Sequence, residues 1–301
     1  MPAKIIVGYE GSERSRDALA LARRLMRVTD SELLLANVYA SGPGPYLGTA
    51  TQRFSDLARR DAERTLHEAP AGVYAELRAI PSTSAARGLH ELAEETGAEL
   101  VVVGSTRRGK LGLIEPGATG ELLLHGGPCA VAVAPAGYAE HAADRCGEVG
   151  VGYAGTEQCR NALDAAIRLA RNLEVRLRII GVVGPPPDLV PVRGRAGEAE
   201  FLEELRQERS RQLDEALAAV PDDVQAEAVQ LEGYPAWVLR EQSHLDFLVI
   251  GSRGFGRIKG SLLGSVSARV VRGATVPVIV IPHDATVAMG DRHAAKLVAS
   301  G

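Results

Sequence analysis

The chain contains few cysteines and no pattern that pairs them. Its 301 residues include only Cys129, Cys146 and Cys159, without C-x-x-C spacing. An odd, unpaired set argues against a disulfide framework or a zinc cage and fits a reducing compartment. The seven histidines are also scattered, without H-E-x-x-H or similar spacing, so the sequence predicts no metal site.

Long apolar runs and a strong charge of one sign are missing as well. No apolar run reaches the roughly 18–20 residues that a membrane-spanning helix needs, and the first residues enter a strand pattern without the apolar core of a signal peptide. The formal net charge of −4 provides no basic surface for nucleic acid or an anionic membrane. We therefore expect a soluble cytoplasmic protein that binds neither of them.

What the chain does contain is a second half that repeats its first. The segments Val7-Gly-Tyr-Glu-Gly11 and Arg16-Asp-Ala-Leu19 return as Val151-Gly-Tyr-Ala-Gly155 and Arg160-Asn-Ala-Leu163. Farther on, Leu100-Val-Val-Val-Gly-Ser105 returns as Phe247-Leu-Val-Ile-Gly-Ser252, and each half ends in a short apolar run that precedes Pro135 or Pro282. Matches in the same order along both halves indicate an internal duplication.

The duplication predicts two domains, at residues 1–140 and 147–284, followed by a C-terminal tail at 285–301. In each domain, runs of Val, Ile, Leu and Ala alternate with helical patterns, and such runs are typical of strands covered on both faces. The runs lie at 4–9, 32–39, 73–79, 99–103 and 130–134, and again at 148–153, 175–183, 225–230, 246–250 and 278–281. Helical patterns cover 13–28, 51–69, 84–96, 117–125 and 197–220, the last with an apolar face of Leu202, Leu205, Leu213, Leu217 and Val220. This α/β alternation predicts doubly wound parallel sheets, which bind ligands beyond the carboxyl ends of their strands.

A glycine-rich loop follows the predicted strand at 246–250. Its pattern is Gly251-x2-Gly254-x9-Gly264-Ser265, and a helical pattern begins there. Glycine lets backbone amides approach an anion closely, and the first amides of a helix have no partner within it. The Ser265 hydroxyl can bond a phosphate or cap the helix. A plain glycine-rich turn with a capping serine explains these residues equally well.

The spacing G-x2-G-x9-G-S after a buried strand resembles the ATP-binding signature of the universal stress protein family. The resemblance covers Lys4 to about Pro135 and Glu148 to about Pro282, and the two V-G-Y-x-G segments and the R-x-A-L helices support it. It implies two tandem five-stranded sheets in the order 3-2-1-4-5, of the adenine nucleotide α-hydrolase-like kind and related by a pseudo-two-fold axis. It also implies pairing of the two halves through their last strands as an intramolecular pseudo-dimer, with further homodimer formation left open. The implied ligand is ATP or AMP, with or without Mg²⁺.

The family pattern also suggests residues for the site in each domain. In the second domain it assigns the nucleoside to Ala154 and Val182, and the phosphates to Gly251, Gly254, Gly264, Ser265, Val266 and Ser267. The first domain offers Glu10, Val38, Gly104, Arg107 and Gly117, but Arg107 stands for a glycine and Ala118 for the serine. The second domain has Ala154 where an acid contacts the nucleoside. Charge-assisted phosphate bonds contribute about 1.5–3 kcal/mol each, more than one neutral bond. We therefore expect the second domain to hold most of the nucleotide.

No catalytic group emerges from the remaining motifs. The segment from Gly104 to Leu111 nearly matches a P-loop, but Leu111 stands where Mg²⁺ binding needs a hydroxyl. Cys129 is interpreted as a buried small hydrophobe and Trp237 as packing for a short helix. Nothing combines a nucleophile, a base and an orienting group. The resemblance thus implies a stress-response protein with a regulatory role. One alternative is a scaffold protein whose nucleotide sites have decayed. The other is a slow ATPase, for which Glu10 and Arg107 are the best of several weak candidates for activating water.

Overall fold

The computed structural model describes residues 3–40, 48–70, 75–106, 110–141, 147–184, 195–252 and 263–282. These residues form two compact units. We call residues up to 141 the N-terminal unit and residues 147–282 the C-terminal unit, and we consider each by itself. The predicted tail at 285–301 lies outside the described residues.

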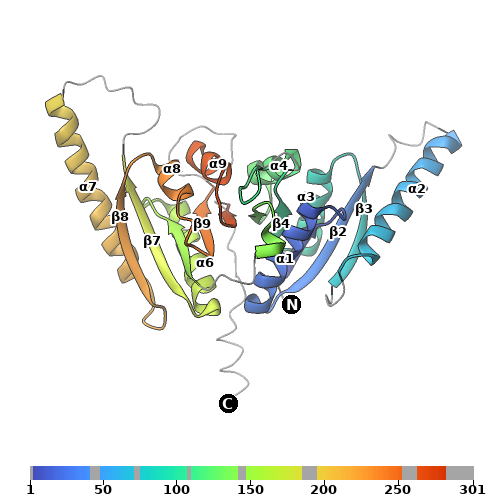
Figure 1. Ribbon diagram of the computed structural model, residues 1–301, viewed down its shortest axis with the longest axis horizontal. Coiled ribbons are helices and arrows are strands. Elements are labelled where there is room, and N and C mark those ends of the chain that lie inside the picture. Colours follow the sequence, from blue (N-terminus) through green and yellow to red (C-terminus); the bar gives the residue numbers. More distant parts are fainter. Residues whose placement is uncertain are drawn as a thin grey trace, which may run out of the picture. The chain divides into compact units, whose positions relative to one another are not determined.

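The N-terminal unit is a five-stranded parallel sheet in the order β3-β2-β1-β4-β5 (Figure 1). Along the chain its elements are β1 (Lys4–Gly8), α1 (Glu13–Thr29), β2 (Glu32–Ala40), α2 (Gly48–His67), β3 (Ala75–Ser82), α3 (Ala85–Thr96), β4 (Leu100–Gly104), α4 (Ala118–Gly126), β5 (Ala130–Ala134) and α5 (Tyr138–His141).

The C-terminal unit repeats this arrangement in the order β8-β7-β6-β9-β10, again parallel. Its elements are β6 (Glu148–Gly152), α6 (Glu157–Leu173), β7 (Arg176–Val183), α7 (Arg195–Ala218), β8 (Ala226–Glu232), α8 (Pro235–Arg240), β9 (Phe247–Gly251), α9 (Ser265–Val271) and β10 (Val278–Ile281). The predicted fold and the strand order 3-2-1-4-5 are confirmed in both units.

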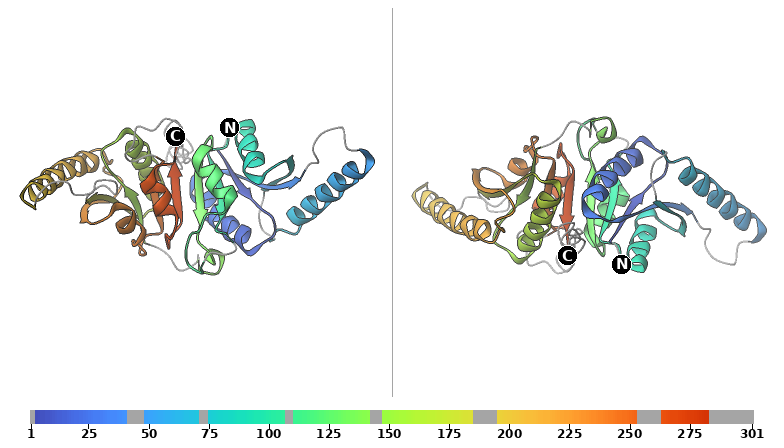
Figure 2. Two further views of the ribbon diagram at one scale, coloured as in Figure 1. Left: turned by 90° about the horizontal axis from the view of Figure 1, so that it is seen from above. Right: turned by 90° about the horizontal axis from the view of Figure 1, so that it is seen from below.

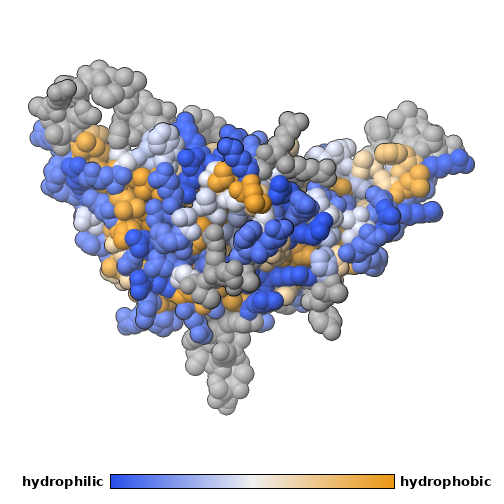
Figure 3. Space-filling view, in the orientation of Figure 1, coloured by the Kyte–Doolittle hydropathy of each residue, from blue (hydrophilic) through white to orange (hydrophobic). Residues whose placement is uncertain are grey.

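The strands form the core because helices pack on both faces of each sheet (Figure 2). All five residues of β5 and all five of β9 are buried. A strand with no solvent-facing side has no reason to alternate polar and apolar residues, which explains the continuous apolar runs. The face seen in Figure 3 is mostly hydrophilic, with apolar patches between the hydrophilic residues.

Two details of packing differ from the sequence-based interpretation. Trp237 lies in the short helix α8 but is 60% exposed, because Ala236 and Leu239 occupy the buried face of that helix. Its indole instead contacts the ring of Tyr234 edge-on, with centroids 5.7 Å apart. On α7, Leu213 is buried as predicted whereas Leu217 is 36% exposed. In the same turn Ala216 is buried, so Leu217 lies on the outer side of the helix.

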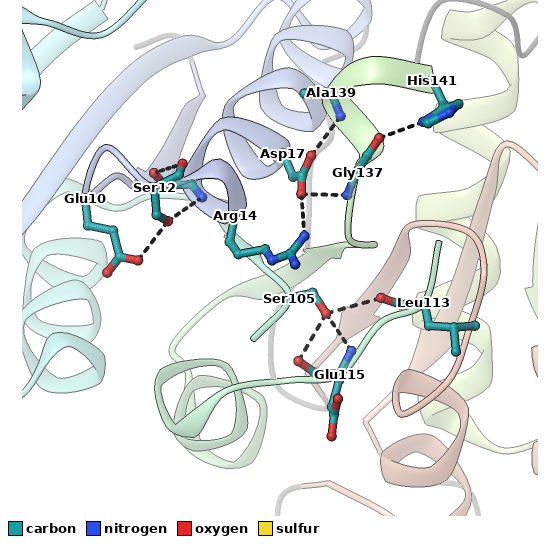
Figure 4. Close-up of polar contacts among 11 residues, drawn as sticks. Glu10, Ser12, Arg14, Asp17, Ser105, Leu113, Glu115, Gly137, Ala139 and His141 are labelled. Carbon is teal, nitrogen blue, oxygen red and sulfur yellow. Dashed lines mark hydrogen bonds and ion pairs between the residues drawn. The ribbon is translucent and has the colours of Figure 1, made fainter. Parts of the chain in front are cut away.

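A buried carboxylate ties the first helix of the N-terminal unit to the end of the sheet. Asp17, on α1, is only 2% exposed. Its two oxygens accept hydrogen bonds from the backbone amides of Gly137 and Ala139, each at 2.9 Å (Figure 4). Arg14 Nη1 lies 3.7 Å from the same carboxylate. A negative charge at the start of α5 satisfies amides that have no partner within that helix.

We expect Asp17→Ala to lower the free energy of unfolding by about 1–3 kcal/mol, because it leaves two amides and a neighbouring guanidinium without their acceptor. Asp61→Ala is the matched control. Asp61 is exposed and, among the described residues, its carboxylate pairs with Arg64 alone, one turn away, so its loss should cost less than about 1 kcal/mol. Urea unfolding followed by circular dichroism measures both, and equal shifts would contradict the assigned role of Asp17.

Candidate functional site

Each unit has a cavity at the carboxyl ends of its strands, where a doubly wound sheet changes strand order. The N-terminal cavity has a volume of about 270 Å³. Glu10, Val38, Gly104 and Gly117 all line it. These residues follow β1, end β2 and β4, and precede α4, so the fold brings together four separate segments that the sequence had nominated. Arg107 lies outside the described residues.

The C-terminal cavity is smaller, at about 80 Å³ between the described residues. Ala154, Val182, Gly251, Val266 and Ser267 line it, as the sequence predicted. Gly264 is the N-cap of α9, and Ser265 is the exposed first residue of that helix. Gly254 lies outside the described residues. The lining is more apolar than in the N-terminal cavity and includes Ile180 and Pro235, where the N-terminal cavity has Ala36 and Ala85.

Glu10 supplies a carboxylate to the N-terminal cavity. One of its oxygens accepts a hydrogen bond from the Ser12 hydroxyl at 2.9 Å (Figure 4). The Ser12 hydroxyl oxygen also accepts from the Ser15 amide at 3.2 Å and so caps α1. The helix start therefore fixes the direction of Glu10. The other charged side chain of the described lining is that of Arg14.

The return path from β4 to α4 is held by one buried serine. The Ser105 hydroxyl oxygen accepts from the Glu115 amide at 2.6 Å and lies 3.1 Å from the Glu115 carbonyl (Figure 4). The Thr106 amide donates to the same carbonyl at 2.6 Å. These bonds place Gly117 at the cavity wall. Ser105 was not among the site residues expected from the sequence, although it stands in the Gly-Ser pair that is repeated at the end of each fourth strand.

The predicted phosphate residue Ser267 has a partner inside the protein. Its buried hydroxyl donates to the Gly251 carbonyl at 2.8 Å. In the same region, the Gly264 amide donates to the Ser252 carbonyl at 2.5 Å. The described part of this loop is therefore bound to the end of β9 by its own hydrogen bonds.

Comparison with known proteins places this arrangement in a family. The model of the universal stress protein family matches residues 1–135 and again residues 147–282. The chain belongs to the universal stress protein family. A universal stress protein of Mycobacterium tuberculosis is 28% identical over 295 residues, covering 92% of this chain and 99% of its own length. One of Mycolicibacterium smegmatis is 31% identical over 297 residues, covering 92% and 96%.

Solved universal stress proteins have the same fold. The structure of one from Archaeoglobus fulgidus superimposes with a TM-score of 0.65 at 20% identity, covering 93% of this chain and 98% of that one. A putative universal stress protein from Pseudomonas aeruginosa gives a TM-score of 0.63 at 17% identity, with coverage of 99% and 98%. The tandem arrangement is thus shared along nearly the whole length of these chains.

Two glycines of this universal stress protein have a steric function that needs no ligand. A Cβ on Gly104 would lie 2.0 Å from the Arg14 carbonyl oxygen, and one on Gly251 would lie 2.9 Å from the Gln158 carbonyl oxygen. Both glycines let the first turn of a helix lie directly against a strand end. Gly117 differs, since among the described residues its Cβ would approach nothing closer than Thr106 at 3.7 Å.

The remaining sequence candidates gain no chemistry in the described residues. Cys129 is buried, and burial raises the pKa of its thiol to about 12. The interpretation of Cys129 as a small core hydrophobe is confirmed. In the described ranges, histidine, cysteine and acidic side chains form no cluster suited to a metal ion. The helices of those ranges include none that is long and apolar enough to cross a membrane.

We expect Gly104→Ala to destabilise the protein by about 1–3 kcal/mol or more, because the new methyl group meets backbone rather than a movable side chain. Gly117→Ala is the matched control, because its new methyl group has room. Thermal unfolding of both variants tests this difference. The steric assignment is wrong if the two variants melt together.

Cys129 should react with iodoacetamide at least about a hundredfold more slowly in the native protein than in guanidinium, because only the thiolate attacks. With a thiol pKa of about 12, the thiolate fraction rises about tenfold per pH unit, so the native rate should still climb from pH 8 to pH 10. Peptide mass spectrometry locates the modified residue. A rate that levels off near pH 9 would show an ordinary exposed thiol.

Proposed function

We propose that this universal stress protein binds an adenine nucleotide and acts as a regulatory stress-response protein rather than as an enzyme. The observation that carries the proposal is the convergence of Glu10, Val38, Gly104 and Gly117 on one cavity. The first two were nominated for a nucleoside and the last two for phosphates, independently of any structure.

The chemistry of the N-terminal cavity suits a nucleoside. The Glu10 carboxylate can accept hydrogen bonds from ribose hydroxyls, and the backbone beside Val38 borders the adenine position. Gly117 precedes the nine-residue helix α4, whose first amides favour an anion. A volume of about 270 Å³ lies near the lower end of ligand pockets, about 300–1,000 Å³. We infer that the cavity takes the nucleoside while the phosphates extend along the start of α4.

A regulatory role fits the side chains that meet there. Within the described lining of the N-terminal cavity, Glu10 and Arg14 carry charge, and no histidine or cysteine is present. Hydrolysis would require a base positioned to activate water beside the phosphates, whereas we assign Glu10, the acidic side chain of the described lining, to the ribose hydroxyls. Ligand binding alone stabilises the bound form by about 2.7 kcal/mol at a hundredfold excess over Kd. That is enough to change which form of the protein a partner meets.

The glycine-rich loop of the second domain supports a competing placement of the nucleotide. It has Gly251, Gly254, Gly264 and Ser265 in the family spacing, whereas the first domain has Arg107 and Ala118 instead. The loop favours the C-terminal unit, and the volume and carboxylate of the cavity favour the N-terminal one. The two placements predict opposite responses to mutation.

Isothermal titration with ATP and with AMP tests the proposal on two variants that each install the other domain's residue. Glu10→Ala copies Ala154, and Gly254→Arg copies Arg107. If the N-terminal cavity holds the nucleoside, Glu10→Ala should weaken binding about tenfold or more, since one charge-assisted bond is lost, and Gly254→Arg should have little effect. The reverse pattern supports the loop of the second domain. Absence of binding heat, together with no nucleotide in mass spectra of the purified protein, would falsify the proposal.

A further inference from the structure

Helices α2 and α7 occupy the same place in their units, and their residues can be matched by contact. A Cβ on Gly11 would lie 3.0 Å from Thr65 of α2, and one on Gly155 would lie 2.5 Å from Gln212 of α7. Gly11 and Gly155 are the final glycines of the repeated V-G-Y-x-G segments. Thr65 and Gln212 therefore hold equivalent positions.

One turn earlier on these helices, the two units differ in charge and size. The position is Ala62 on α2 and Arg209 on α7, and Ala62 is buried. The strand beneath differs as well. Gly8 pairs with Ala36 and Gly152 with Ile180, so the next residues, Asn37 and Gly181, are equivalent. At these two equivalent positions the N-terminal unit has Asn37 and Ala62, whereas the C-terminal unit has Gly181 and Arg209.

The two differences in the C-terminal unit depend on each other. A Cβ on Gly181 would lie 2.7 Å from Cδ of Arg209 and 3.0 Å from its Cγ. The arginine stem therefore lies directly on the backbone of β7, and any larger residue at position 181 would force the stem to move. The missing side chain at Gly181 thus leaves the space that the long side chain of Arg209 occupies. We call these two residues the Arg209–Gly181 pair.

The arginine stem carries the guanidinium to the carboxyl edge of the sheet. Arg209 Nη1 donates to the Tyr153 carbonyl at 3.3 Å and to Gln212 Oε1 at 2.8 Å. Tyr153 directly precedes Ala154, the position nominated for the nucleoside. Arg209 lines the C-terminal cavity, whereas Ala62 does not reach the N-terminal one. The cavity with the arginine is the smaller, at about 80 Å³ against about 270 Å³.

We propose that Arg209, admitted by Gly181, is a specificity-determining residue that closes the nucleoside end of the C-terminal cavity. The N-terminal cavity then takes the adenine nucleotide and the C-terminal cavity rejects it. This inference rests on the proposed function and names the side chain that decides between the two units. It predicts one nucleotide per chain, despite two copies of the fold.

The charged groups of the two cavities favour nucleotide binding in the N-terminal unit, as the cavity volumes do. The N-terminal cavity has the Glu10 carboxylate to accept from ribose hydroxyls, and the C-terminal cavity has Ala154 in its place. Arg209 has only donors, so it cannot replace that acceptor. In the described residues Arg209 donates to two neutral acceptors and forms no ion pair, and its Nε has no hydrogen-bond partner. A guanidinium without a carboxylate partner can also attract phosphate, which makes increased affinity through Arg209 the opposing outcome.

Titration of ATP into three forms of the chain separates these outcomes. The wild type should bind one nucleotide. Arg209→Ala, which copies Ala62, should add a second, weaker site, whereas Arg209→Met retains the bulk of the stem and should remain at one. Two sites in the wild type, or a single site in Arg209→Ala, would overturn the inference. So would a loss of affinity in both variants, which would make Arg209 a phosphate ligand.

The reciprocal experiment installs the residues of the Arg209–Gly181 pair at the equivalent positions of the N-terminal unit. Asn37→Gly with Ala62→Arg should weaken ATP binding at least tenfold relative to Asn37→Gly alone, because only the double variant has both the arginine and the space for its stem. Equal affinities would contradict the inference. Circular dichroism and thermal unfolding establish that both variants are folded.

A third readout separates failure of the inference from failure of the proposed function. If no form binds nucleotide, the proposed function is wrong, but the cavity can still be measured. A crystal structure of Arg209→Ala should show a C-terminal cavity enlarged at the end beside Ala154. An unchanged cavity would show that Arg209 does not close it.

Discussion

The contact between the first turn of a helix and the end of the fourth strand of its sheet sets the geometry of both units. At Gly104 a Cβ would lie 2.0 Å from the carbonyl oxygen of Arg14, and Gly251 repeats the contact with Gln158. The close approach places the residue after the first strand beside the residue after the fourth. A cavity at the switch point of the sheet follows from that juxtaposition. Side chains from more distant elements, such as Arg209 of α7, also line such a cavity and help to decide what fits.

The two units have the same backbone fold but cavities of different volume and lining, so the fold alone does not determine which ligand is bound. Both have the strand order, the helix cap after the first strand and the glycine at the fourth strand end. They differ at the neighbouring acid and on the helix that covers the second strand. Duplication relaxes the demand on either copy, because under the proposed function one binding unit is enough. The helix position that holds Ala62 in one unit and Arg209 in the other can then change the cavity while the sheet stays the same.

The sequence predicted the sheet well because the physics behind it is local. Strands covered on both faces need continuous apolar runs, and β4 and β9 appear in the sequence as Leu100-Val-Val-Val and Phe247-Leu-Val-Ile. Strand order came from the family resemblance, since apolar runs alone do not order strands. The exposure of Trp237 was missed because a six-residue helix has one buried face, and which residues take it depends on tertiary contacts.

The candidate site was predictable in part, for the same reason. Glu10, Val38, Gly104 and Gly117 lie at strand ends and a helix start, and the carboxyl ends of parallel strands always meet at one edge. Arg209 was not predictable, because its place depends on the register of α7 over β7 and on the missing side chain at Gly181. The steric role of Gly104 and Gly251 was not recognised from the sequence, because the glycine motif suggested phosphate binding for both residues.

A glycine motif is therefore weaker evidence for nucleotide binding than the volume and lining of the cavity next to it. Gly251 is needed for helix packing, and the hydroxyl of Ser267 bonds the carbonyl of Gly251. Such residues can persist after a site has ceased to bind, because the fold still depends on them. Glu10 has the opposite character. It is exposed and its side chain bonds only the Ser12 hydroxyl among the described residues, so stability alone gives little reason to retain a carboxylate there. Residues that the fold does not need are the better guide to which of two duplicated cavities is still in use.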